Sequence, residues 1–276
     1  MTTALQNRLE QQSDQLADFI HRHAPLLVLT GAGISTDSGI PDYRDSLGNW
    51  KRKQPVQHQE FMHCAATRQR YWARSLVGWP IMQQAQPNPA HHKIAELETR
   101  GLLSMTVTQN VDRLHQKAGS NTVIDLHGRA DQLVCMSCGH QEQRALMHDR
   151  CAALNPSLGN VIATVAPDGD ADLEMDFSDF NVPGCPQCDG ILKPDVVFFG
   201  DNVPRPRVEQ VFAALADSRG LLVIGSSLMV FSGYRFARQA HQAGTPVAIL
   251  TQGRTRADEL ASVKFDSPIA PLLASV

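Results

Sequence analysis

Four of the six cysteines occur as two C-x-x-C pairs, a spacing that is typical of metal sites. With two residues between them, both thiolates of a tight turn can reach one ion, and four thiolates complete the tetrahedral shell of zinc. Because no position is left for water, we expect a structural zinc ion and not a catalytic one. We expect Gly139 and Gly190 to provide the unusual backbone angles behind the pairs. The predicted ligands are Cys135, Cys138, Cys185 and Cys188.

Spacing alone leaves other uses of these cysteines open. An iron–sulfur cluster also takes four thiolates, whereas a redox C-x-x-C motif needs only one pair. Disulfides are typical of secreted proteins, and the chain shows no secretion signal. Cys64 and Cys151 lie outside both pairs, and we expect them to be inert or exposed thiols.

A glycine loop, "TGAGISTDSGIPDYRD" at residues 30–45, begins like the G-x-G-x-x-G fingerprint of dinucleotide-binding proteins. Gly31 and Gly33 are present, but Thr36 occupies the third glycine position. Gly39 and Pro41 follow at once, so the helix that usually begins here cannot continue. Taken alone, this loop is a weak motif for a phosphate-bearing ligand.

Polar residues that could do chemistry follow two apolar runs of the sequence. Gln109, Asn110 and Asp112 follow the run 102–108, and His127 follows the run 122–126. Ligand-binding groups of an open α/β sheet lie at the carboxyl ends of its strands, and a histidine there can act as a general base near neutral pH. Asn-x-Asp is also a common turn and cap, and a lone histidine is more often structural, so both interpretations stay open.

The apolar runs alternate with helical stretches, which predicts an α/β fold: a Rossmann-like parallel sheet with helices on both faces. The clearest helix is 88–101, where Asn88 can cap, Pro89 suits the first turn and Gly101 terminates. An amphipathic helix is expected within residues 1–23. The predicted strands are 25–29, 102–108, 122–126, 220–225 and 245–250.

Two segments do not follow this alternation of strands and helices, and they predict a smaller domain. The segment 41–86 carries Trp72 and Trp79 one heptad apart on an expected helix, where we favour a role in the core. The segment 131–193 carries the cysteine pairs, and its acidic stretch 141–181 is expected to be mostly a solvated loop. The run "LKPDVVFFGD", 192–201, is expected to return to the main sheet. The expected division is 1–40, 87–130 and 194–276 for the Rossmann-like domain, 41–86 for a cofactor loop with a helical insertion, and 131–193 for the zinc module.

Composition excludes several classes of protein. A chain of 276 residues that is 42% hydrophobic can bury a substantial core, and its net charge of −3 argues against a basic nucleic-acid surface. No apolar run reaches the roughly 18 residues of a membrane span. The N-terminal segment lacks an apolar signal region and carries Glu10, Asp14 and Asp18, unlike a transit peptide. We expect a cytoplasmic monomer without nucleic-acid or membrane partners.

Seven motifs in order give the chain a family resemblance across nearly its whole length. Together they resemble the sirtuins, which are NAD-dependent protein lysine deacylases. The segments "RQRYWARSLVGWP", "APDGD", "LKPDVVFFGD" and "SGYRF" resemble the class II branch, which includes animal mitochondrial sirtuin 4. The seven motifs are "GAGIS…SGIPDYR", "PNPAH", "TQNVDRLH", "DLHG", the two C-x-x-C pairs, "KPDVVFFG" and "GSS".

The resemblance implies roles for the matching residues. NAD is the implied co-substrate, and His127 is the implied general base, with Asn110 and Asp112 completing the catalytic set. Substrate contacts are implied for Val196, Val197, Phe198, Phe199, Gly200 and Leu228, where an acyl-lysine peptide pairs as an extended strand. NAD contacts are implied for Gly31, Ala32, Gly33, Ser35, Thr36, Pro41, Asp42, Tyr43, Arg44, Gln109, Asn110, Asp112, Gly225, Ser226, Ser227, Thr251, Gln252, Gly253 and Ile269.

The implied reaction is a group transfer and not a reduction. The acyl oxygen of the modified lysine attacks the nicotinamide ribose, and nicotinamide leaves. His127 then assists a ribose hydroxyl in attacking the resulting imidate. Water then releases free lysine and O-acyl-ADP-ribose. Protein mono-ADP-ribosylation is the alternative that shares every NAD residue, and a non-catalytic NAD- or zinc-dependent binding module is a third class.

The chain departs from the family pattern at named positions. Asp45 stands where many sirtuins have Ser, and Thr251 stands where Asn is usual. The class II resemblance implies acceptance of long or polar acyl groups such as lipoyl, biotinyl or hydroxymethylglutaryl, which is the basis for expecting lipoamidase activity. Tyr71 and Arg74 have the spacing of the Tyr-x-x-Arg pair of desuccinylases, but their place in the acyl pocket is open.

Overall fold

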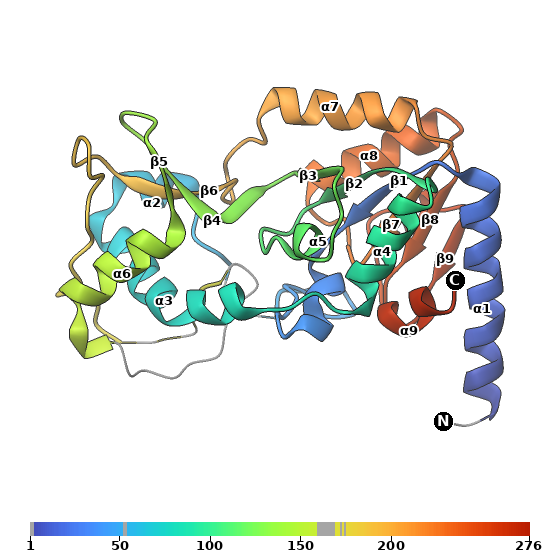
Figure 1. Cartoon of the computed structure of the whole chain (residues 1–276), viewed down its shortest axis with the longest axis horizontal. Helices are drawn as coiled ribbons and strands as arrows, with labels where there is room; N and C mark the ends of the chain where they lie inside the picture. The colour runs from blue at the N-terminus through green and yellow to red at the C-terminus, as the bar shows by residue number, and fades with distance from the viewer. Residues whose placement is uncertain (1–2, 52–53, 159–168, 172, 174) are drawn as a thin grey trace.

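A computed structural model describes residues 3–51, 54–158, 169–171, 173 and 175–276. Its larger domain is a parallel six-stranded sheet with the strand order β3-β2-β1-β7-β8-β9 (Figure 1). The chain runs outward from β1 to β3 and then crosses to β7 on the other side of β1. The carboxyl ends of β1 and β7 therefore flank a topological switch point, where open α/β sheets bind ligands. The strands are β1 Leu26–Thr30, β2 Leu103–Thr108, β3 Val123–Asp125, β7 Gly220–Ile224, β8 Val247–Leu250 and β9 Val263–Phe265.

Helices cover both faces of this sheet, because its strands are apolar on both sides. Along β1, Leu26 and Val28 pack with the helices α1 (Thr3–His23), α4 (Pro89–Thr99) and α9 (Ile269–Ala274). Leu27 and Leu29 point to the other face and pack with α7 (Arg205–Ala216) and α8 (Phe231–Gln242). Figure 1 shows α7 and α8 on one side of the sheet and α1, α4 and α9 on the other.

The predicted cap of α4 is confirmed and also fixes the glycine loop. The Oδ1 of Asn88 accepts from the amide of Ala90 at 2.9 Å, with Pro89 in the first turn. Its Nδ2 donates to the carbonyl of Ile34 at 2.7 Å and to the hydroxyl of Ser38 at 3.0 Å. One side chain thus ends the loop and starts the helix.

The smaller domain lies at one side of the sheet domain (Figure 1). Its antiparallel sheet has the order β5-β4-β6. The helices α2, α3 and α6 pack on it around an apolar cluster that includes Phe61 and Tyr71. Trp72 and Trp79 are buried on α3, so the prediction that they serve the core is confirmed. The elements are α2 His58–His63, α3 Ala65–Gln84, β4 Gly128–Cys135, β5 Gln141–Gln143, α6 Arg144–Leu154 and β6 Leu192–Val196.

Four short elements complete the described chain. They are the 3₁₀ helices η1 (Ala32–Ser38), η2 (Pro156–Leu158) and η3 (Asp258–Leu260), and the helix α5 (Leu114–Lys117). Within the described ranges, no helix has both the length and the apolar character that a membrane crossing requires.

Two expectations about the segment after His127 were wrong. The run 192–201 does not return to the main sheet, because β6 pairs with β4 in the small antiparallel sheet. The stretch 141–181 is not mostly solvated loop, since α6 buries Met147 and Cys151 in the small core. The last part of "APDGD", Gly169 and Asp170, lies against α3, and its first residues lie outside the described ranges.

Two of the four expected domain boundaries fall inside strands. The boundary after residue 130 cuts β4, and the boundary before residue 194 cuts β6. Both strands carry the chain between the domains, so the division of the chain at these points stays a prediction. The strand β9 had no counterpart among the expected strands.

Candidate active site

The glycine loop and the "GSS" segment pack against each other where β1 and β7 end. The amide of Gly33 donates to the carbonyl of Gly225 at 2.8 Å, and the amide of Gly31 donates to Ile224 at 3.0 Å. A Cβ atom on Gly31 would lie 2.7 Å from the Cβ of Ser226, and one on Gly33 would lie 2.9 Å from the carbonyl oxygen of Gly225. Glycine is therefore required here for the close approach of two backbones.

These contacts refine the expected role of the loop. The amides of Gly31 and Gly33 are used within the protein, so they do not face outward to phosphates. The helix that follows is a 3₁₀ helix of seven residues, and it ends at Gly39 with a φ of 83°. The early stop inferred from Gly39 and Pro41 is confirmed. Thr36 is exposed, and its hydroxyl donates to the carbonyl of Gly33.

A buried polar cluster joins the glycine loop to the end of β2. The hydroxyl of Ser35 donates to Oδ2 of Asp112 at 2.8 Å and accepts from Nδ2 of Asn110 at 3.0 Å. The amide of Leu114 donates to the other oxygen of Asp112 at 2.9 Å. Burial raises the pKa of Asp112, and these two donors oppose that rise. The predicted Asn-x-Asp pair therefore both caps a turn and faces the loop.

Gln109 connects this cluster to His127 and to Ser226. Its Oε1 accepts from the hydroxyl of Ser226 at 2.6 Å, and its backbone carbonyl lies 3.0 Å from Nδ1 of His127. A carbonyl can only accept, so Nδ1 carries the proton and Nε2 is left with a free lone pair. Three predicted residues from three strand ends thus meet directly.

Backbone geometry holds His127 at the junction of the two domains. The carbonyl of His127 accepts from the amide of Val197 at 2.8 Å. The next residue, Gly128, has a φ of 85° and lies so close to the backbone of Asp195 that a Cβ has no room. Strand pairing and the close approach at Gly128 therefore fix the backbone of the "HG" dipeptide.

Burial lowers the pKa of His127 to about 4, and the charges of Arg207 and Arg235 add to this effect. The hydrogen bond to the carbonyl of Gln109 acts in the opposite direction. The imidazole is consequently neutral at neutral pH, with Nε2 able to accept a proton.

Ser232 is a site residue that sequence reasoning missed. Its hydroxyl lies 2.7 Å from Nε2 of His127, so it donates to the lone pair that Nδ1 protonation leaves free. The adjacent Gly233 gives room to the side chain of Gln109, whose Nε2 would lie 2.5 Å from a Cβ. The segment "SGYRF" resembles the class II branch, and nothing in its spacing indicates a contact with His127.

The expected cofactor loop is folded against the strand ends. Asp45 accepts from the amides of Leu47 and Asn49, both at 2.9 Å, and so closes a turn. Arg44 stacks on Trp50 at 4.0 Å from the ring centroid. This turn is what the unusual Asp45 provides. Of the other loop residues, Asp42 pairs with Lys51, Tyr43 meets Trp50 edge to face, and Pro41 is half-buried.

The residues expected near adenosine lie beyond β8. Thr251 is buried, and Gly253 has a φ of 81° and donates to Asp266 at 3.2 Å. The carbonyl of Ser46 accepts from the amide of Arg254 at 2.8 Å, so the cofactor loop rests on this segment. Gln252 is exposed. Ile269 begins α9 and packs with the apolar cluster that contains Leu26 and Val28.

The expected substrate segment runs beside His127. Phe198 is buried against Phe61 and Tyr71, with ring centroids 5.3 and 5.5 Å away. Phe199 pairs with the chain at Gln57, and Gly200 turns with a φ of 80°. Val196 closes β6, and Leu228 is a buried non-glycine residue with a φ of 54°. Their contact with a substrate stays a prediction.

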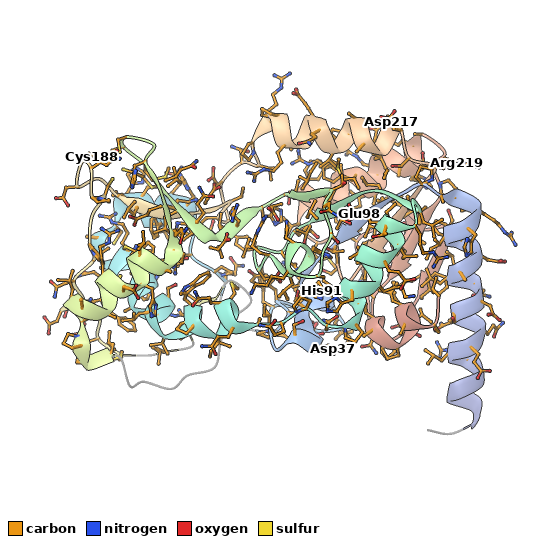
Figure 2. All side chains as sticks on the ribbon, viewed as in Figure 1. Asp37, His91, Glu98, Cys188, Asp217 and Arg219 are labelled. Atoms are coloured by element: carbon orange, nitrogen blue, oxygen red, sulfur yellow. The ribbon has the colours of Figure 1, made fainter. Side chains whose placement is uncertain are left out.

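A pair of buried histidines lies beneath the polar cluster. Nε2 of His115 is 2.9 Å from the hydroxyl of Thr30, and the rings of His91 and His115 are 5.0 Å apart. Figure 2 shows His91 where α4 begins, next to the glycine loop. Burial lowers the pKa of His91 to about 4 and that of His115 to about 3, so both are neutral.

The four predicted cysteine ligands converge. Their Sγ atoms all lie within 4.8 Å of one another, which fits a tetrahedral zinc site. The amides of Ser137 and Gln187 donate to Cys135 and Cys185, both at 3.4 Å, as expected for thiolates in tight turns. Figure 2 shows Cys188 at the outer end of the small domain, far from the six-stranded sheet.

The glycine assignment behind the second pair was wrong. Gly139 has a φ of 74°, as expected, but behind Cys188 the left-handed residue is Asp189, with a φ of 58°. Gly190 is needed for another reason, because a Cβ there would lie 2.5 Å from the Oγ of Ser137.

Comparison with known proteins agrees with this architecture. The model of the Sir2 family matches residues 31–232. An NAD-dependent protein deacetylase of Xanthomonas campestris pv. campestris (strain 8004) is 56% identical over 267 residues, which cover 96% of this chain and 91% of the relative. The NAD-dependent protein deacylase Sirt4 of Drosophila melanogaster is 47% identical over 263 residues, 94% of this chain and 84% of that one.

Solved structures give the same result. A Sir2 complex with a p53 peptide and NAD+ has a TM-score of 0.74 and 28% identity, with 94% of each chain covered. Sir2 bound to an acetylated peptide has a TM-score of 0.75 and 28% identity at the same coverage. With the family model covering more than half of its length, the chain belongs to the Sir2 family, the sirtuins.

Proposed function

We propose that this protein is an NAD-dependent protein lysine deacylase that releases nicotinamide, free lysine and O-acyl-ADP-ribose. The observation that carries the proposal is the state of His127. Its Nδ1 is held by the carbonyl of Gln109, so a neutral Nε2 faces the hydroxyl of Ser232 beside the β1–β7 switch point. A neutral imidazole in this position can take a proton from a hydroxyl group.

The residues at the switch point fit a dinucleotide. In the proposal, NAD lies across the ends of β1 and β7, between the glycine loop and the "GSS" segment. Ser226, Gln109 and Asn110 supply amide and hydroxyl groups suited to ribose and carboxamide. The loop 41–51 covers the ligand, as its position against Gly253 and Arg254 suggests.

NAD supplies an activated ribose carbon, and this chain supplies the proton transfer. Nε2 of His127 accepts the proton of a ribose hydroxyl as that oxygen bonds to the acyl carbon, the lysine amine leaves, and water completes O-acyl-ADP-ribose. The hydroxyl of Ser232 must turn away from Nε2 for this to happen. The buried carboxylate of Asp112 orders Ser35 and the turn at Leu114, so it positions the nicotinamide side of the site.

The acyl-lysine peptide is proposed to lie as an extended strand between residues 196–200 and Leu228. Two relatives in complexes are described with a p53 peptide and with an acetylated peptide, which supports a protein substrate. The Drosophila relative is named a deacylase and the bacterial relative a deacetylase. The acyl group is therefore the feature to be determined by experiment.

One experiment tests the proposed function. The protein is incubated with NAD and peptides that carry acetyl-, lipoyl-, biotinyl- or hydroxymethylglutaryl-lysine, and products are identified by mass. We expect deacylated peptide and O-acyl-ADP-ribose, both abolished in His127→Ala. ADP-ribose attached to protein with no deacylation of any peptide contradicts the proposal and favours mono-ADP-ribosylation.

A further inference from the structure

An exposed aromatic residue beside His127 is surrounded by three arginines. Phe231, at the start of α8, is 43% exposed. The guanidinium carbons of Arg235, Arg238 and Arg256 lie 5.0, 5.3 and 5.9 Å from its ring centroid. Arg256 also lies 4.3 Å from the ring centroid of Tyr234. We name these five residues the Phe231 patch.

The charges of this patch are not neutralised within the described parts of the chain. None of its three arginines forms an ion pair with a described carboxylate. Arg256 donates to the carbonyl of Met229 at 3.3 Å, and the buried Nε of Arg235 has no hydrogen-bond partner there. Three like charges around one ring repel each other, although the chain as a whole carries a net charge of −3. Such an arrangement is suited to an anionic partner.

The patch adjoins the catalytic histidine. Ser232, which contacts Nε2 of His127 at 2.7 Å, follows Phe231 directly. Phe231, Arg235 and Arg238 share one face of α8, and seven helical residues span about 10 Å. An extended peptide covers that length with about three residues. A peptide strand that places its lysine at His127 thus has its neighbouring residues within reach of the patch.

We propose that the Phe231 patch binds acidic side chains that flank the acylated lysine of protein substrates. The guanidinium groups gather around the two aromatic rings, and carboxylates pair with arginine through two hydrogen bonds. The inference rests on the proposed deacylase function and adds a substrate preference to it. A single ring with three cations is too small for the broad basic surface of a nucleic-acid interface, so an acidic peptide is the occupant that fits.

Two peptides test the inference. They carry the same acyl-lysine and differ only in three residues on each side of it, Glu in one and Gln in the other. We expect kcat/KM to be about 3- to 10-fold higher for the Glu peptide at low salt, since exposed ion pairs contribute about 0.2–1 kcal/mol each. The preference should shrink at about 0.5 M salt because of screening.

Matched variants locate the effect. The double variant Arg238→Gln with Arg256→Gln keeps long polar side chains and removes two charges. Its ratio of kcat/KM values for the two peptides should fall to near one, and its urea unfolding midpoint should match that of the wild type. Arg219→Gln is the control. The exposed Arg219 precedes β7, so it lies at the end of that strand opposite to the carboxyl end, where the candidate active site is (Figure 2). Its ratio should equal that of the wild type.

The outcomes separate the inference from the proposed function. Equal turnover of both peptides by the wild type, or an unchanged preference in the double variant, overturns the inference alone. No turnover of either peptide refutes the deacylase itself. A third outcome is that the wild type binds single-stranded DNA, that the double variant loses this binding, and that the wild type shows no preference for the Glu peptide. This result overturns the inference in favour of a nucleic-acid ligand.

Discussion

Replacing His91 with glutamine should make the protein less sensitive to acid. His91 is fully buried, and its Nδ1 accepts from the amide of Asn88 at 3.3 Å in the capping box of α4. Glutamine is a usual residue at this capping position, so His91→Gln keeps the cap. It removes a group that is neutral when folded and becomes charged when unfolded.

The size of the effect follows from the pKa of His91, which is lowered from 6.5 to about 4 by burial. Between these two values the unfolded chain binds the proton and the folded chain does not. The free energy of unfolding therefore rises with pH across this window and is lost as pH falls. At pH 5 the difference is about 1.5 pKa units, or about 2 kcal/mol at 1.36 kcal/mol per unit.

Urea unfolding at pH 7.5 and pH 5.0 measures this quantity. Between pH 7.5 and pH 5.0, the free energy of unfolding should fall by about 2 kcal/mol more in the wild type than in His91→Gln. His92→Gln is the control, because His92 is the next residue of the same helix and is exposed. The free energy of unfolding of His92→Gln should fall by as much as that of the wild type. Equal losses in His91→Gln and the wild type would refute the claim that His91 is buried and neutral.

Three further predictions concern the site and the metal. Ser35→Ala removes the donor to Asp112 and the acceptor of Asn110, so it should lower the free energy of unfolding by about 2–4 kcal/mol. The control Thr36→Ala changes an exposed residue and should lower it by under about 1 kcal/mol. Equal losses in the two variants would contradict the prediction. Gly33→Ala places a Cβ 2.9 Å from the carbonyl of Gly225 and should weaken NAD binding in calorimetry at least about tenfold, whereas Gly244→Ala, with no atom within 4 Å, should bind NAD normally. Cys188→Ser should lower the bound zinc well below one per chain and reduce the melting temperature, while the exposed Cys64→Ser retains the metal; full zinc in Cys188→Ser would disprove the site.

Local patterns predicted the elements of the large domain well. The continuous apolar runs before Gly31, Gln109 and Gly225 predicted buried parallel strands, and the signals at Asn88 and Pro89 predicted the start of α4. The two cysteine pairs predicted that the four thiols converge, because four thiolates complete the tetrahedral shell of one zinc ion.

The misplaced pieces depend on long-range pairing. Nothing in the run 192–196 shows that it pairs with residues 128–135 instead of with the main sheet. Acidic composition suggested a solvated stretch at 141–181, yet α6 has a buried side with Met147 and Cys151. The contact between Ser232 and His127 joins residues 105 positions apart, so no local spacing could reveal it.

The family resemblance supplied what spacing left open. Asn110, Asp112 and His127 each had an equally reasonable structural role from sequence. The structure shows a structural role for Asp112, which caps the turn at Leu114 and binds Ser35, and its catalytic role stays a prediction. One residue can serve a structural and a catalytic role at once, so the sequence pattern alone could not decide between the two roles.

The most direct test of the central claim is the ratio of nicotinamide released to peptide deacylated in one reaction with NAD and an acetyl-lysine or lipoyl-lysine peptide. A deacylase of the proposed kind gives one nicotinamide per deacylated lysine, with no nicotinamide in the absence of peptide, and His127→Ala loses both products together. Deacylation without nicotinamide release, or nicotinamide release with the acyl-lysine intact, would contradict the account.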